Sequence, residues 1–80
     1  MISEKLYLFT KELEYSNIER CVCHIEERND DQYYLDFPFT GELRLVKKHT
    51  LGWKMRRKLF REVRYDELAY LMLKGLGTNG

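Results

Sequence analysis

Apolar side chains change their spacing twice along this chain. Near the N-terminus three of them recur at helical intervals: Leu6, Phe9 and Leu13. They follow Ser3, a residue type that favours the first position of a helix, and they precede the turn-forming pair at residues 16–17. The pattern therefore predicts an N-terminal helix from Ser3 to about Tyr15.

From Arg20 onward the spacing becomes alternating, which is typical of a strand. One face of this first expected strand carries three side chains: Cys21, Cys23 and Ile25. Turn chemistry follows at Asn29–Asp31. A second alternating run then places four side chains on a face that we expect to be buried: Tyr33, Leu35, Phe37 and Phe39. These features predict two antiparallel strands joined by a short turn.

Pro38 bears on where the second strand lies in the sheet. Proline has no N–H to donate to a neighbouring strand, so the run is expected at a sheet edge, or frayed at its end. Tyr34 would then be available on an exposed edge to a partner's strand or aromatic side chain. After the turn at Thr40-Gly41, Leu43 and Leu45 alternate with Arg44 and Val46. This third strand completes a three-stranded antiparallel meander.

Residues 51–64 fit two interpretations. As a helix, they align four apolar positions in one stripe: Leu51, Met55, Leu59 and Val63. As a strand, they place Trp53 with Met55 on one face and Lys54 with Arg56 on the other. The composition favours the helix, because Lys, Arg, Leu and Met propagate helices well. The strand remains the alternative.

A last helix is expected from Asp66, a good capping residue, to the glycines at 75 and 77. The chain is then an α+β protein, a small two-layer domain with an N-terminal helix, a three-stranded antiparallel meander and one or two C-terminal helices. A single domain spans residues 1–76, and residues 77–80 form a flexible tail. Eighty residues suffice for one small core.

Charge is distributed unevenly although the chain carries only +1 overall. Residues 1–43 hold ten acids and four bases, a net −6, whereas residues 44–64 hold nine bases and one acid, a net +8. So dense a run of cations exceeds what solubility requires. The basic segment at 44–64 is therefore the strongest candidate for a binding surface.

Rows of cations suit the phosphates of nucleic acid, and a nearby aromatic ring can stack on an unpaired base. We expect a small, non-enzymatic regulatory protein that engages DNA, RNA or a nucleoprotein complex. The predicted contact residues are Arg44, Lys47, Lys48, His49, Trp53, Lys54, Arg57, Lys58, Arg61 and Arg64.

Three alternatives stay open for the same residues. The cations are a solvated face, partly neutralised by the acidic half; or they dock a partner protein, as in an inhibitor or adaptor of the kind common among phage and mobile-element products; or the chain forms a homodimer through an exposed edge. The acidic half is itself a possible surface for a basic partner.

Other chemistry finds little support. Cys21 and Cys23 lack a second pair of ligands for zinc and are expected in the core, so we predict no metal and no cofactor. Motifs for nucleophilic, phosphate-loop or zinc-protease catalysis are missing, so no enzyme is expected. No apolar run is long enough to span a membrane and no signal peptide is apparent, which places the protein in the cytoplasm, without membrane partners.

Overall fold

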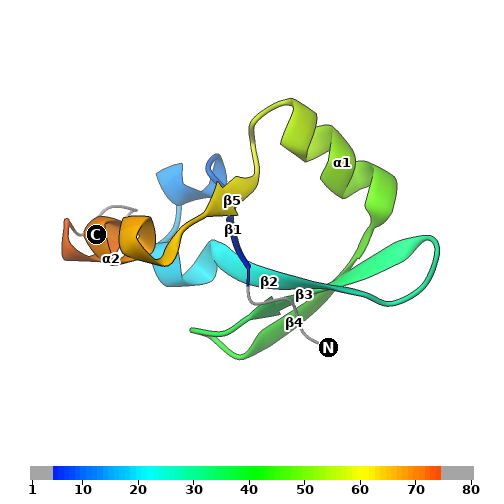
Figure 1. Cartoon of the computed structure of the whole chain (residues 1–80), viewed down its shortest axis with the longest axis horizontal. Helices are drawn as coiled ribbons and strands as arrows, with labels where there is room; N and C mark the ends of the chain where they lie inside the picture. The colour runs from blue at the N-terminus through cyan, green and yellow to red at the C-terminus, as the bar shows by residue number, and fades with distance from the viewer. Residues whose placement is uncertain (1–4, 75–80) are drawn as a thin grey trace.

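The structure, a computed structural model, describes residues 5–74, which form an α+β domain (Figure 1). Its strands are β1 (Leu6–Leu8), β2 (Val22–Glu27), β3 (Gln32–Phe37), β4 (Glu42–Lys47) and β5 (Arg61–Val63). Its helices are α1 (Lys48–Arg56) and α2 (Tyr65–Leu73), with two short 3₁₀ helices, η1 (Glu12–Glu14) and η2 (Ile18–Arg20). The predicted class is confirmed, whereas the predicted arrangement is wrong in the respects given below.

The five strands form one antiparallel sheet in the order β4-β3-β2-β1-β5. Strand β2 pairs with different strands along its length. Val22 and Cys23 pair with β1, and the residues from His24 onward pair with β3. The sheet therefore bends at β2, and α1 lies across the inside of the bend (Figure 1). This arrangement places α1 next to β4 and opposite residues of β1, β2 and β3.

The expected N-terminal helix is absent from the described residues, and part of it is strand β1. Leu6 and Leu8 are buried and Tyr7 is half-buried, so this short run alternates as a strand does. Leu6 pairs with Val63 of β5, and Leu8 pairs with Val22 of β2. The helical spacing of Leu6, Phe9 and Leu13 was misleading, because pairing with a strand on each side of β1 overrides the local preference of its residues. The expected cap at residue 3 lies outside the described residues.

The three predicted strands exist as antiparallel neighbours, but they do not make up the whole sheet. Strand β3 lies between β2 and β4, so the expected edge position of this strand and of Tyr34 is wrong. Pro38 instead lies in the turn that follows β3, where no partner strand requires an N–H from this position. Phe39 is 47% exposed in the same turn and is not part of the core. Within residues 5–74 the sheet edges are β4 and β5.

The segment at 51–64 is divided between the two interpretations. It is helical up to Arg56 and a strand from Arg61, so neither a single helix nor a single strand describes it. Lys58 ends the helix with a left-handed φ of 59°. The N–H of Leu59 donates to the carbonyl of Lys54 (2.9 Å), and the N–H of Lys58 to that of Met55 (3.0 Å). This is a Schellman motif with lysine where glycine is usual.

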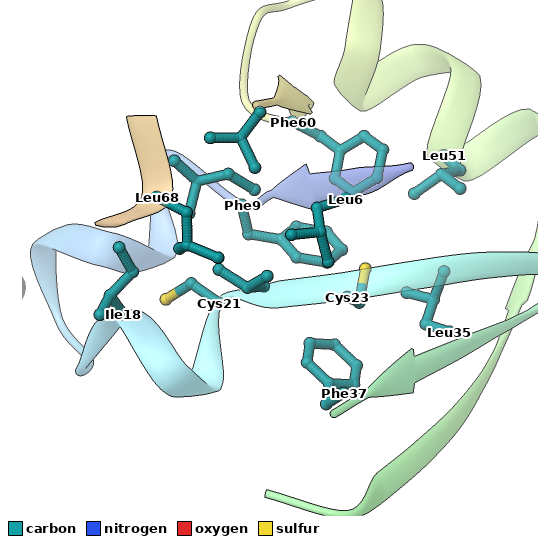
Figure 2. Close-up of a cluster of buried hydrophobic side chains, with 13 residues drawn as sticks. Leu6, Phe9, Ile18, Cys21, Cys23, Leu35, Phe37, Leu51, Phe60 and Leu68 are labelled. Atoms are coloured by element: carbon teal, nitrogen blue, oxygen red, sulfur yellow. The ribbon is translucent and has the colours of Figure 1, made fainter. Parts of the chain in front are cut away.

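The core gathers side chains from every part of the sheet and from both α-helices (Figure 2). Phe60 is fully buried, and its ring lies 5.2 Å from that of Tyr7 and 4.6 Å from that of Phe9. Cys21 and Cys23 are fully buried, which confirms their assignment to the core. Phe60 thus anchors the chain between α1 and β5 to strand β1.

Helix α2 begins at Tyr65, one residue before Asp66, the residue that was expected to cap it. The cap position is Arg64, and Asp66 lies within the first turn. Leu68 is buried, which fixes this helix to the core, while its last residue, Leu73, is exposed. The expected terminating glycines and the tail at 77–80 lie outside the described residues.

Candidate nucleic-acid interface at the end of α1

The predicted contact residues fall into two classes, according to whether or not they form an ion pair with a carboxylate. Four are ion-paired within the structure: Arg44 with Glu42, Lys48 with Glu27, Arg61 with Glu67, and Arg64 with Asp66. The remaining ones make no ion pair with any residue in the range 5–74. The basic segment is therefore not one uniform surface.

Arg44 is held on the inner face of the sheet. Its Nε and Nη2 donate to the two carboxylate oxygens of Glu42 at 3.0 and 3.1 Å, and its guanidinium lies 4.6 Å from the ring centroid of Phe37. The hydrogen bonds to Glu42 raise the pKa of Arg44 and lower the pKa of Glu42. A cation so engaged supports the fold and has little to offer a phosphate.

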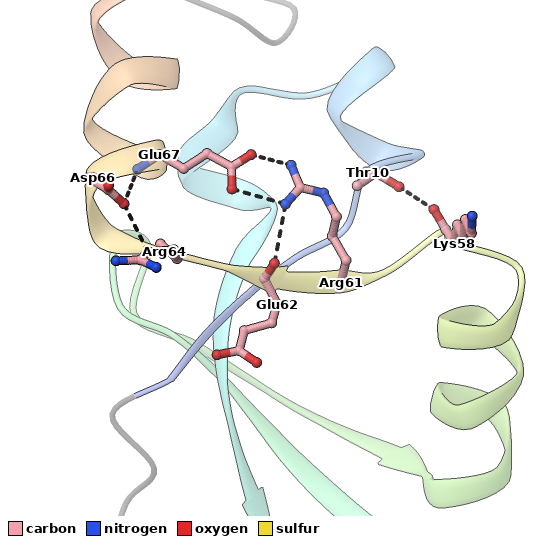
Figure 3. Close-up of polar contacts among 7 residues, drawn as sticks. All are labelled: Thr10, Lys58, Arg61, Glu62, Arg64, Asp66 and Glu67. Carbon is pink, nitrogen blue, oxygen red and sulfur yellow. Dashed lines mark hydrogen bonds and ion pairs between the residues drawn. The ribbon is translucent and has the colours of Figure 1, made fainter.

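The β5–α2 junction, residues 61–67, contains the second group of paired cations (Figure 3). Arg61 forms a two-point pair with Glu67, with one contact of 3.0 Å, and also donates to the carbonyl of Glu62 at 3.2 Å. Arg64 lies 3.5 Å from Asp66, whose carboxylate also accepts the N–H of Glu67 at 2.9 Å. These acids lie in the first turn of α2, where the helix dipole favours negative charge.

A hollow of about 510 Å³ lies against the same junction. It is lined by Lys5, Leu6, Glu62, Val63, Arg64, Tyr65 and Asp66. Two carboxylates stand among its cations, so the hollow does not favour a polyanion. The better candidate for a polyanion site lies at the C-terminal end of α1.

Four cations at the C-terminal end of α1, which we call the α1-end cluster, make no ion pair within the described chain: Lys54, Arg56, Arg57 and Lys58. Three of them are exposed and Lys54 is half-buried. Arg57 lies 5.1 Å from the ring of Trp53, which is itself 45% exposed. The negative end of the helix dipole attracts cations here without any ligand, so their presence also has a structural explanation.

Arg56 belongs to this cluster although it is not among the contact residues predicted from the sequence. On an ideal wheel it lies off the arc of the other cations, yet the helix ends at this residue and the chain turns at Lys58. Conversely, Lys47 and His49 lie at the opposite end of α1, away from the cluster. A helix shorter than expected thus changes which residues share a surface.

The lysine that ends α1 is also tied to a distant part of the chain. The hydroxyl of Thr10 donates to the carbonyl of Lys58 at 2.9 Å (Figure 3), and the N–H of Thr10 donates to the carbonyl of Leu59 at 3.1 Å. These bonds use main-chain atoms and leave the ammonium of Lys58 directed to solvent. The cluster is therefore anchored by its backbone.

Three further features of the described residues bear on thiol reactivity, metal binding and membrane insertion. Burial raises the pKa of Cys21 to about 11 and that of Cys23 to about 12, so both thiols are protonated and unreactive at neutral pH. In the part of the chain that the structure describes, no three His, Cys, Asp or Glu side chains are grouped to hold a metal ion. Over the same residues, no helix is long and apolar enough to cross a membrane.

Some of the ion pairs could have been found in the sequence. Glu42 and Arg44 are two residues apart in a strand and must share a face. Glu27 and Lys48 are 21 residues apart, and only the β2–β3–β4 register brings them together.

Comparisons with protein-family models, curated proteins and solved structures found no match.

Proposed function

We propose that this protein is a small, non-enzymatic binding protein that engages nucleic acid through the α1-end cluster, and we place its action in the cytoplasm. The observation that supports the proposal is that four cations lie in the last turn of α1 and the residues just after it, none of them paired with a carboxylate of the described chain. Each cation that meets a phosphate releases condensed counterions, which drives association.

The pairing pattern identifies the residues that would make contact. Arg56, Arg57 and Lys58 are exposed and need give up no carboxylate within residues 5–74 to meet a phosphate. Arg61 and Arg64 would first have to leave their carboxylates. Trp53 adds an exposed ring beside Arg57, and such rings stack on unpaired bases.

The test is fluorescence anisotropy with labelled single-stranded and double-stranded oligonucleotides at about 50 and 200 mM salt. Two double variants remove equal charge: Arg56→Gln with Arg57→Gln, and Arg61→Gln with Arg64→Gln. We expect the first to reduce the slope of log affinity against log salt by about 1.4 on single strands, since each lost contact contributes about 0.7. The second should leave this slope nearly unchanged.

The result that contradicts the proposal is equally direct. If the wild-type protein binds no strand at either salt, the cluster is a solvated helix end. If both double variants lose binding equally, net charge alone attracts the strand and the cluster has no special part.

A second candidate, self-association, is supported by the edge of the sheet. On β4, Leu43 and Leu45 are 62% and 45% exposed, and this strand has one neighbour, β3. Exposed apolar side chains on an open edge favour pairing with another strand. Sedimentation of the wild type and of Leu43→Lys with Leu45→Lys tests this candidate, because only the wild type should form a dimer.

A further inference from the structure

A groove runs along α1 on the side opposite to its solvent face. It has a volume of about 320 Å³ and is lined by Tyr7, Ile25, Tyr33, Lys48, Leu51, Gly52 and Met55. The helix contributes positions 48, 51, 52 and 55, which form one stripe at helical spacing. The opposite wall comes from β1, β2 and β3. The groove thus lies inside the bend of the sheet.

Two cations lie along this stripe. At the start of α1, the ammonium of Lys48 lies 4.9 Å from the ring centroid of Tyr33 and pairs with Glu27. Arg56 follows the stripe in sequence, and its Nη1 lies 3.8 Å from the point that a Cβ on Gly52 would occupy. A member of the α1-end cluster thus lies beside a residue of the groove wall.

The missing side chain at Gly52 keeps the middle of the groove open. Glycine within a helix costs about 1 kcal/mol relative to alanine, and its φ here is not left-handed, so backbone conformation does not require it. A Cβ at this position would meet the Arg56 side chain at an ordinary contact distance. Space beside the helix is the local consequence of glycine at this position.

We propose that this groove receives an unpaired nucleobase, so that the ligand class is single-stranded nucleic acid; this inference rests on the proposed function of the α1-end cluster. Two tyrosines and aliphatic side chains supply apolar walls for a flat ring. Arg56, which has no carboxylate partner within residues 5–74, lies beside Gly52 and can meet a phosphate next to the base. A base within a duplex is stacked between its neighbours and paired with its partner, so it does not enter such a groove without being unstacked and unpaired.

The test uses Gly52→Leu, which fills the groove and improves helix propensity, so that a loss of binding does not reflect unfolding. Tyr33→Leu removes a ring from the wall. Its matched control is Tyr34→Leu, since the neighbouring tyrosine lies on the opposite face of β3. We expect Gly52→Leu and Tyr33→Leu to lose roughly 5- to 150-fold in affinity for a single strand, the range for one stacked base. Tyr34→Leu should bind as the wild type does.

The ligand supplies a second control. A strand of the same length built from abasic nucleotides keeps every phosphate and lacks every base. It should bind the wild-type protein no more tightly than the ordinary strand binds Gly52→Leu. Its affinity should retain the salt dependence that the α1-end cluster confers.

Failure of this inference can be told from failure of the proposed function. If Gly52→Leu and Tyr33→Leu bind the ordinary strand like the wild type while Arg56→Gln with Arg57→Gln weakens binding, the groove is empty and the cluster still binds phosphates. If the neutralised cluster binds as tightly as the wild type, the proposed function fails and the inference with it. Should Tyr33→Leu fail to fold, Gly52→Leu decides alone.

Discussion

The two ends of the basic segment show opposite treatments of similar charge. At the α1-end cluster four cations have no carboxylate partner within residues 5–74, whereas at the β5–α2 junction Arg61 and Arg64 are both paired. The two regions are separated by only Leu59 and Phe60 in the sequence. Helix polarity accounts for much of the difference: α1 presents its C-terminal end and α2 its N-terminal end. The helix dipole favours acidic side chains in the first turn, as in α2, and basic side chains in the last turn, as in α1.

This difference teaches that a count of cations does not locate a binding surface. The same net charge can be consumed inside the fold or left available, and the structure divides one basic segment between the two uses. Substitutions in each region, and at the residue between them, test how far the two regions are independent.

The largest effect is expected from Phe60→Ala, which removes the anchor between the two regions. Phe60 is fully buried against Tyr7 and Phe9, so its truncation should destabilise the fold by about 3–5 kcal/mol. A domain of this size has roughly that much stability, so both regions should unfold together. Urea denaturation measures the loss, with Phe39→Ala as the exposed control. A well-folded Phe60→Ala protein would show that the regions do not share this anchor.

Lys58→Gly should act on the α1-end cluster in two opposite ways. Glycine relieves the left-handed φ of 59°, so thermal unfolding should show a gain of about 1 kcal/mol. The lost ammonium should at the same time reduce the salt slope of single-strand binding by about 0.7. Lys58→Asn, which also tolerates this conformation and lacks the charge, is the control. Unchanged stability in Lys58→Gly would contradict the assignment of strain to this lysine.

Glu67→Gln should make the β5–α2 junction resemble the α1-end cluster. Losing the partner of Arg61 costs less than about 1 kcal/mol, because the pair is partly exposed and screened by solvent. The freed guanidinium should raise nucleic-acid affinity a few-fold at low salt, measured by anisotropy. Glu62→Gln removes the same charge without breaking an ion pair and serves as the control. Equal gains in the two variants would mean that net charge, and not pairing, determines affinity.

The smallest expected effect is the pH dependence of the same pair. The hydrogen bond from Arg61 lowers the pKa of Glu67, so its stabilisation is complete above the ordinary carboxyl pKa and is lost as the pH falls through the lowered value. Urea midpoints of the wild type and Glu67→Gln should therefore converge on acidification from about pH 6 to pH 3. A gap that persists at the acidic end would show that Glu67 acts through packing and not through charge.

Local pattern anticipated the middle of the sheet better than its ends. Alternation from residue 22 to residue 37 is long enough to identify β2 and β3, and turn chemistry at Asn29–Asp31 separates them. Strands β1 and β5 have three residues each, and both arise from pairing between segments far apart in the sequence. Such pairing leaves almost no local signal, which is why the first of them was predicted as a helix.

The sequence shows where the cations lie, but it does not show which of them are paired with carboxylates. That cations cluster between residues 44 and 64 is plain from composition. Which of them have partners depends on the ends of two helices and on contacts such as that of Lys48 with Glu27, which only the fold creates. The groove beside α1 was not foreseen, since its walls come from three strands and one helix. Gly52 was its one visible sign.

The position of β1 between β2 and β5 also determines the order of events during synthesis. Among the five described strands, β1 is made before the others, and its edge toward β5 stays unpaired at least until residue 63 has been made. The ring contacts of Phe60 with Tyr7 and Phe9 must wait equally long. Since such distant pairings form slowly, the nascent chain displays its cationic helix before its sheet is complete. A chain interrupted at Leu59 would therefore be an open-edged polypeptide prone to aggregation, and not a smaller version of the same domain.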